Sequence, residues 1–410
     1  MKTISRHTVI SLAVSALVTV ILIFIPTGFE GAVQFKDADK CRVKIESVDN
    51  SRIIDTGLIR SGQQVCSIKF LSGKFKGQHS EGWNMLGGSL SQDKLFYTGD
   101  VAQAVVHYSE EESSSGTVTE IISVNLIDHY RLSGEIILAA VFALFLLVFA
   151  GQTGARSVMS FVLTILVLWK ILVPLNLKGA DPILTGLLVT AILTFIILAL
   201  VYGFDRRLVA SCGGAMLGIG LSAILSVVCT KTFKIHGAIM PNSESLLYSG
   251  YQYLNLTHIF MASVCVGASG SIMDLSVDIT SAVNEVVKKC PSISRFEAVK
   301  SGVAVARAAM GTMTTTLLLA YSGSCIALLM TFMAQGTPIY NILNNNQVAA
   351  EIINTIAGSF GLASTAPFTA FLSGMILAGK NRTKRACLRT VFRRLHSVCL
   401  KHRIWNLHSR

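Results

Sequence analysis

The sequence predicts a mainly α-helical protein: a polytopic membrane helix bundle of about eight transmembrane helices with a small extracytoplasmic β-rich domain. The chain is 51% hydrophobic and only 14% charged, a composition typical of multi-pass membrane proteins rather than soluble enzymes. Apolar runs of about 20 residues recur along it, and one polar region interrupts them. Four parts follow: an N-terminal transmembrane anchor (1–29), a β-rich, barrel-like domain (30–132), a seven-helix transmembrane domain (133–379) and a basic cytoplasmic tail (380–410).

The first apolar run extends from Thr8 to Ile25 and follows two basic residues, Lys2 and Arg6. A cleaved signal peptide is one interpretation. The run is longer than a usual signal-peptide core, however, and no small-residue cleavage site follows it. We therefore expect an uncleaved anchor with its N-terminus in the cytoplasm.

The polar region between 30 and 132 has the pattern of short β-strands. Apolar and polar residues alternate from Cys41 to Glu46 and from Val65 to Phe70, and glycine-containing turns separate such runs. Several short strands with this punctuation predict a small barrel-like domain. Outside the cytoplasm its two cysteines, Cys41 and Cys66, could form a disulfide. The sequence leaves open whether they pair or remain free thiols.

Seven further apolar segments predict transmembrane helices at approximately 134–151, 156–175, 183–203, 208–229, 258–283, 308–335 and 348–378. Lys and Arg concentrate in alternate loops and in the tail, as the positive-inside rule requires if both termini are cytoplasmic. Gly214 and Gly218 predict close helix packing. The last segment is long, and we expect it to kink or break near Pro367.

Candidate functional residues concentrate between 271 and 316. Five side chains fall within about 80° on one helix face, and three of them are acidic; they are Ser271, Asp274, Asp278, Ser281 and Glu285. On the next helix Arg307, Gly311 and Thr314 share a second face. Carboxylates at membrane depth mark an ion or substrate path, or a buried ion pair.

Two functions of different classes follow. In the first, the chain is a transporter or permease of unknown substrate: Asp274 binds a cation or proton, Asp278 and Glu285 extend the path inward, and Arg307 balances charge or contacts an anion. In the second, the chain is a non-transporting envelope assembly or interaction protein, the β-rich domain binds a partner, and the charged pair only holds helices together. A homo-oligomer is compatible with both.

No signature of an intramembrane enzyme is present, so we expect no enzymatic activity, no catalytic residues and no cofactor. No cysteine or histidine spacing predicts a metal site. Two other charged residues occur in the apolar segments, and we expect both at the membrane interface. Lys170 extends to the membrane surface, and Glu351 lies outside the hydrocarbon.

The tail from 380 to 410 contains ten Lys and Arg residues and no acid. Four arginines form one stripe of a predicted amphipathic helix, a pattern that suits anionic lipid headgroups; they are Arg382, Arg385, Arg389 and Arg393. Nucleic acid is a disfavoured partner, because the helix is tethered at the bilayer. The expected location is the bacterial inner membrane.

Several motifs in order resemble the YibE/F-like family of bacterial multi-pass membrane proteins. One, 25–29, follows the anchor, and another, 71–77, lies within the β-rich region. The others are 128–131, 246–250, 267–274, 281–285, 310–313 and 319–323. The resemblance implies a membrane protein often described as a permease and supplies no substrate. The chain departs from the family pattern at Asp278, Ala308 and Thr315, where a small residue, an aspartate and an asparagine are expected. A mechanism that uses an acid beside Arg307 would therefore need Asp278.

Overall fold

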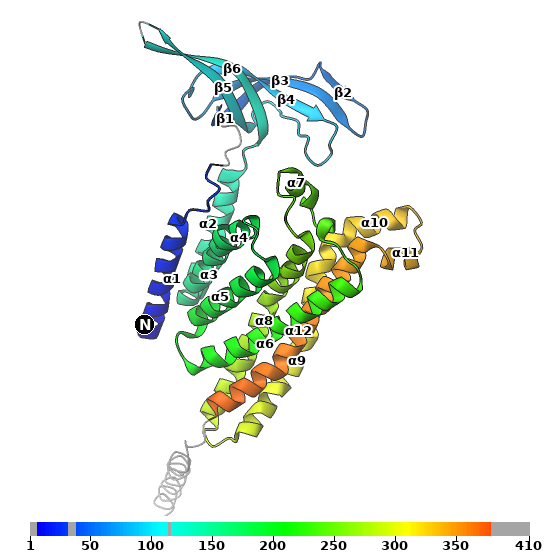
Figure 1. Cartoon of the computed structure of the whole chain (residues 1–410). Helices are drawn as coiled ribbons and strands as arrows, with labels where there is room; N and C mark the ends of the chain where they lie inside the picture. Colours follow the sequence, from blue (N-terminus) through cyan, green and yellow to red (C-terminus); the bar gives the residue numbers. More distant parts are fainter. Residues whose placement is uncertain (1–5, 32–37, 114–115, 379–410) are drawn as a thin grey trace, which may run out of the picture. The chain divides into compact units, whose positions relative to one another are not determined.

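A computed structural model describes residues 6–31, 38–113 and 116–378. The chain divides into two compact units, Phe29–Phe149 and the remainder, and each is described by itself (Figure 1). The arginines of the predicted amphipathic tail (382, 385, 389 and 393) lie outside the described residues.

The first unit contains a closed five-stranded barrel, which confirms the predicted β-rich domain. The barrel strands pair in the order β1-β5-β6-β4-β3, β1 closes the ring against β3, and β2 extends β3 at one edge. All pairings are antiparallel except β4 with β6, which meet at Trp83 and Asn125. This connectivity is that of an OB-fold barrel. The strands are β1 (Ala38–Asp49), β2 (Ile53–Asp55), β3 (Arg60–Phe70), β4 (His79–Gly87), β5 (Val101–Ser113) and β6 (Gly116–His129).

The two barrel cysteines are free thiols, so the disulfide that the sequence left open is not formed. In the β1–β3 register Val43 lies opposite Phe70, which places Cys41 six residues along the ladder from Cys66. Six residues of strand correspond to about 20 Å, far beyond the separation that a disulfide can bridge. Burial raises the pKa of each thiol to about 11, and the Asp39 carboxylate adds to the shift of Cys41. Both thiols therefore stay protonated and unreactive at neutral pH.

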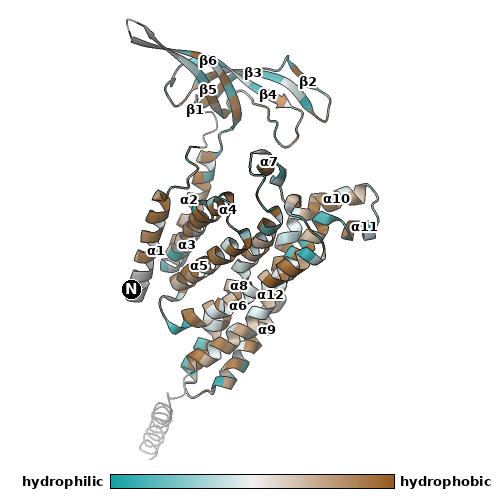
Figure 2. Cartoon of the chain, in the orientation of Figure 1, coloured by the Kyte–Doolittle hydropathy of each residue, from teal (hydrophilic) through white to brown (hydrophobic). Residues whose placement is uncertain are grey.

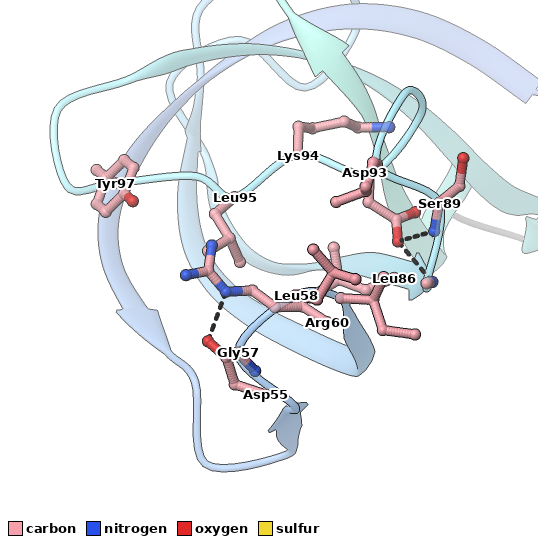
Figure 3. A pocket seen from close by; sticks show the side chains of 13 residues that line it. Asp55, Gly57, Leu58, Arg60, Leu86, Ser89, Asp93, Lys94, Leu95 and Tyr97 are labelled. Atoms are coloured by element: carbon pink, nitrogen blue, oxygen red, sulfur yellow. Dashed lines mark hydrogen bonds and ion pairs between the residues drawn. The ribbon is translucent and has the colours of Figure 1, made fainter. Parts of the chain in front are cut away.

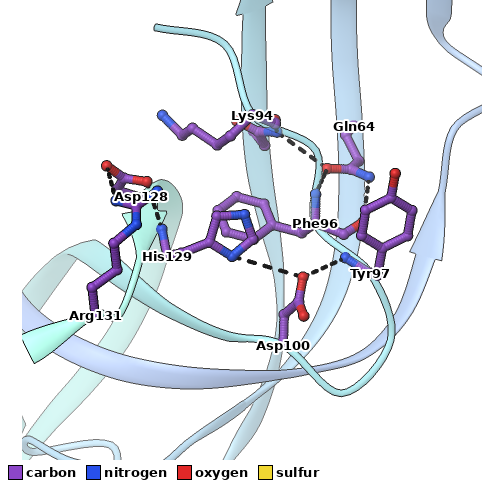
Figure 4. A network of polar contacts seen from close by, with 9 residues as sticks. Gln64, Lys94, Phe96, Tyr97, Asp100, Asp128, His129 and Arg131 are labelled. Atoms are coloured by element: carbon purple, nitrogen blue, oxygen red, sulfur yellow. Dashed lines mark hydrogen bonds and ion pairs between the residues drawn. The ribbon is translucent and has the colours of Figure 1, made fainter. Parts of the chain in front are cut away.

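A buried amide ties the barrel strands to the loop between β4 and β5 (Figure 4). The Gln64 side chain is fully buried. Its Nε2 donates to Asn50 Oδ1 at 2.8 Å and to the Phe96 carbonyl at 2.9 Å. Its Oε1 accepts from the Phe96 N–H at 3.0 Å and from Asn84 Nδ2 at 3.1 Å. One side chain thus satisfies polar groups from three segments of the barrel.

We expect Gln64→Leu to destabilise the barrel by about 3 kcal/mol, because it leaves the buried N–H and carbonyl groups of Phe96 without their partner. Unfolding of the full chain can be followed by Trp83 fluorescence after Trp169 and Trp405 are replaced by Phe. Gln63→Leu is the matched control, since Gln63 is half-buried on the opposite face of β3. Equal losses for the two variants would contradict the role of the Gln64 network.

The long apolar helices confirm a multi-pass membrane protein. Among the described residues, seven helical segments are long and apolar enough to cross a bilayer, and Figure 2 shows apolar residues along these helices. They correspond to α2 (Leu132–Ala150), α3 to α4 (Gln152–Leu177), α5 (Pro182–Tyr202), α6 (Arg206–Thr232), α8 (Leu256–Lys289), α9 to α10 (Arg295–Ala334) and α12 (Asn346–Leu377). The predicted anchor is the 19-residue helix α1 (Arg6–Phe24), which packs on α3 and α5. The connecting segments include α7 (Ser243–Tyr248) and α11 (Ile339–Leu343).

Two helices differ in detail from the sequence-based expectation. Helix α9 begins at Arg295, well before the apolar segment, because Ser294 and Glu297 form a reciprocal capping box. Arg307 therefore lies within α9 and not at its start. Helix α12 continues through Pro367 without ending, so the expected break does not occur there.

Helices α6, α8 and α12 form the centre of the second unit and contact one another through small residues. A Cβ on Gly214 would overlap the Thr369 side chain, and one on Gly218 would overlap Thr365 and lie 2.8 Å from the Gly361 carbonyl. Buried hydroxyls join the same helices: Ser211 pairs with Ser276 at 2.8 Å and Thr280 with Ser373 at 3.0 Å. The predicted close approach at Gly214 and Gly218 is therefore confirmed.

Candidate functional site

The predicted acidic face of α8 is a polar stripe that runs along much of the helix. We call it the α8 stripe; its members, within about 80° of one another, are Ser263, Gly267, Ser271, Asp274, Asp278, Ser281 and Glu285. None of them is buried, whereas Ile272, Leu275 and Ile279 on the opposite side are fully buried. From Ser263 to Glu285 the stripe is about 33 Å long, which is close to the hydrocarbon thickness of a bilayer.

Tyr202 of α5 contacts the stripe near its Glu285 end. Its hydroxyl donates to the Val277 carbonyl at 2.7 Å and lies 2.9 Å from Ser281 Oγ. The Arg207 guanidinium lies over the Tyr202 ring, 5.1 Å from its centroid. Arg207 also pairs with Asp205 at 2.8 Å. A basic side chain with its own acidic partner therefore stands beside this end of the stripe.

Glu285 itself is paired on its own helix. Its Oε1 accepts from Lys288 Nζ at 3.1 Å, and both side chains are exposed. An exposed pair of this kind is worth little stability. Of the three predicted carboxylates, Glu285 is therefore the one whose charge is already paired.

Helices α8 and α9 meet where Gly267 faces Tyr321. A Cβ on Gly267 would lie 2.6 Å from the Tyr321 hydroxyl. Asp274 and Thr314 are each seven residues, about two helical turns, from this contact on their own antiparallel helices. They therefore lie at about the same level along the two helices. The Thr314 hydroxyl donates to the Met310 carbonyl at 2.8 Å, and Gly311 faces open space.

The structure does not bring Arg307 into an ion pair with either aspartate. Within the described part of the chain, no acidic oxygen lies within 4.0 Å of the Arg307 guanidinium, and Asp274 and Asp278 have no basic partner within that distance. All three side chains are exposed, so none is held in the contact surface between the helices. The buried pair that the sequence allowed is absent there.

This arrangement predicts a small energetic coupling between Asp278 and Arg307. We expect Asp278→Asn and Arg307→Gln each to change the free energy of unfolding by less than about 0.5 kcal/mol, and the double variant to equal their sum. Thermal unfolding of the four proteins in detergent measures the cycle. A coupling near the 3–5 kcal/mol of a broken buried pair would show that the two side chains do meet.

Sequence reasoning missed a cavity at the other end of the stripe. It has a volume of about 320 Å³, and Ser263 of the stripe lines it together with Glu351 and Asn354 of α12. Glu351 accepts from Ser324 Oγ and from Asn354 Nδ2, each at 3.3 Å. We call it the Glu351 cavity. The sequence does contain one signal, because Glu351 and Asn354 lie on the same face of one helix. An interfacial position for Glu351 explains that spacing without a cavity.

Two buried polar atoms lie near the Glu351 cavity without hydrogen-bond partners among the described residues. They are the Asn354 Oδ1 and the Tyr321 hydroxyl. Buried polar atoms without partners are rare in folded proteins and call for a bound water, ion or ligand. The Tyr321 hydroxyl lies against Gly267 of the stripe, so this region adjoins the path toward Asp274.

The barrel has a cavity of its own, of about 380 Å³, between the β2–β3 turn and the loop after β4 (Figure 3). Its charged groups are largely satisfied internally. Arg60 pairs with Asp55 at 2.7 Å, and the Asp93 carboxylate accepts from the backbone N–H groups of Gly88 at 2.6 Å and Ser89 at 2.8 Å. Backbone hydrogen bonds, that of Gly87 foremost, hold the pKa of Asp93 below its ordinary value.

Several long apolar helices, one of which has a polar stripe along its length, define a polytopic integral membrane protein. The chain belongs to the YibE/F-like family, which it matches over residues 138–379, and the resemblance seen in the motifs is confirmed. No curated protein and no solved structure matches the chain. In the part of the chain that the structure describes, no three His, Cys, Asp or Glu side chains are grouped to hold a metal ion.

Proposed function

We propose that this YibE/F-like protein is a permease for a small cation or proton that moves along the α8 stripe. The observation that carries the proposal is the stripe itself: accessible oxygen-bearing side chains and glycines continue for about the thickness of a bilayer. Asp274 is the central acid, about 16 Å from Ser263 along the helix. An ionisable residue at this depth is costly in lipid and is usually associated with an ion pathway.

The sign of the charges favours a cation. The stripe contains three carboxylates, and the cavity at its Ser263 end adds a fourth, Glu351. Among the described residues only Glu285 of these four has a basic partner within 4.0 Å, Lys288. A succession of unneutralised carboxylates raises the local concentration of cations and repels anions. Arg307, level with the inner part of the stripe, would limit the charge that accumulates there.

Flux through the purified full chain in proteoliposomes tests the proposal. Sodium, potassium and proton fluxes are compared with chloride flux and with protein-free liposomes. We expect at least one cation to move faster than in empty liposomes while chloride does not. Protein-dependent chloride flux without cation flux would reject the proposal, and so would the absence of any protein-dependent flux for the panel and for small organic ammonium ions.

We further infer that both termini face the cytoplasm and the barrel lies on the other side. The support is the distribution of Lys and Arg between alternate loops. Lys76→Cys is exposed on the barrel, and Cys290 is an exposed native thiol between α8 and α9. An impermeant maleimide on intact cells should label Lys76→Cys, whereas Cys290 should react only after permeabilisation. Labelling in the reverse order would invert the topology.

The barrel supports a second candidate function, that of an interaction protein. Leu58, Leu90 and Tyr97 line the barrel cavity and are more than 60% exposed, and exposed apolar side chains grouped in this way are typical of protein contacts. The structural charged pair on which this alternative also depended is absent between Arg307 and the two aspartates. The barrel is thus the remaining support for an interaction function, and an interaction function of the barrel is compatible with transport by the helices.

A further inference from the structure

The Glu351 cavity combines one carboxylate with mostly apolar walls. Glu351 and Asn354 of α12 and Ser324 after α9 provide the polar side. Ile239, Met240, Phe260 and Leu328 provide the apolar side. The lining residues come from four separate segments of the chain, so the cavity is a product of the tertiary fold.

The negative charge in this cavity is not balanced by the protein. No Lys, Arg or His is among the described residues that line it. The two groups that donate to Glu351 are neutral, and both hydrogen bonds are long at 3.3 Å. Asn354 adds a buried Oδ1 acceptor without a partner. A half-buried carboxylate without a basic partner is stabilised by a positive donor, which offsets its loss of hydration.

The volume and walls indicate what kind of cation fits. A space of about 320 Å³ is about ten times the roughly 30 Å³ that one water occupies in the liquid, so a bare inorganic ion would leave most of it unfilled. Divalent metals prefer several carboxylate or imidazole ligands, and the described lining offers one carboxylate. Apolar walls opposite a single acid are instead the arrangement that holds an ammonium group attached to an apolar chain.

We propose that the Glu351 cavity binds a small organic ammonium ion. The ammonium group donates to the Glu351 carboxylate, and the apolar part of the ligand lies against Met240, Phe260 and Leu328. Ser263 places this site at the start of the α8 stripe, so an organic ammonium ion would also be the substrate class of the proposed permease. Only this link to transport rests on the proposed function. Binding itself requires no transport.

Calorimetric titration of the purified full chain in detergent with n-butylammonium chloride tests the site. We expect saturable binding, weaker binding of methylammonium, and none of 1-butanol or of sodium chloride at equal concentration. Glu351→Gln should weaken butylammonium binding by about 30-fold or more, because it removes the opposing charge and keeps the side-chain size. Glu244→Gln, an exposed acid on α7, is the matched control and should bind like the parent. Leu328→Ala should reduce the preference for butyl- over methylammonium.

The possible failures are distinguishable. Absence of saturable butylammonium binding, or binding that Glu351→Gln leaves intact, would overturn the proposal, and equal binding of sodium would overturn the organic ligand. Binding that depends on Glu351 in detergent, with no butylammonium or inorganic cation flux in proteoliposomes, would establish the site and reject the permease. Circular dichroism of each variant separates lost binding from lost folding.

Discussion

Gly218→Leu should prevent stable packing of the helical unit. A Cβ at this position overlaps the Thr365 hydroxyl and lies 2.8 Å from the Gly361 carbonyl, so α12 backbone as well as a side chain would have to move. Ile272 of α8 also packs against Gly361, where an added Cβ would lie only 3.1 Å from it, and this contact limits how far α12 can retreat. We expect a loss of about 3 kcal/mol or more, at the upper end for overpacked cores.

Gly220→Leu on the same helix is the matched control, because a Cβ there meets no atom within 4 Å. Thermal unfolding and the monodisperse fraction in detergent compare the two variants. Gly220→Leu should behave like the parent, while Gly218→Leu should unfold at a much lower temperature or fail to accumulate. Similar behaviour of the two would mean that α6 and α12 are not in contact in the folded protein.

The packing at Gly218 could be predicted from the sequence because it depends on a local pattern. Two glycines four residues apart on an apolar helix already indicate a close neighbour. The transmembrane spans were accessible for the same reason, since hydrophobic length is a local property. The Ser294–Glu297 capping box is equally local, but it lies in a polar turn before the apolar segment, and hydropathy alone does not place the start of a helix there.

Features that depend on distant segments could not be obtained in this way. The Glu351 cavity joins the α8, α10 and α12 regions with the loop at Ile239, and no spacing within one helix encodes that meeting. The separation of Cys41 from Cys66 depends on the β1–β3 register, which alternation alone does not fix. The relation of Arg307 to Asp278 likewise depends on the rotation of two long helices, which hydropathy leaves undetermined.

Asp274→Asn should abolish cation flux and leave the fold intact. Asp274 is exposed and has no ion-pair partner within 4.0 Å among the described residues, so its charge contributes little to helix packing. Asparagine keeps the size and hydrogen-bonding capacity of the side chain but can neither carry a negative charge nor exchange a proton. If the α8 stripe is the path, Asp274 is its central acid. No other residue of the stripe is as well placed to replace it.

Glu285→Gln provides the contrast for Asp274→Asn, since Glu285 is an exposed acid of the same stripe already paired with Lys288. We expect flux per folded molecule to fall to the protein-free level for Asp274→Asn and by less than about threefold for Glu285→Gln, because an exposed pair of this kind makes a small energetic contribution. Both variants should unfold within about 0.5 kcal/mol of the parent. A parent-like flux for Asp274→Asn would remove the central residue of the proposed path, and unfolding of the variant would assign Asp274 a structural role.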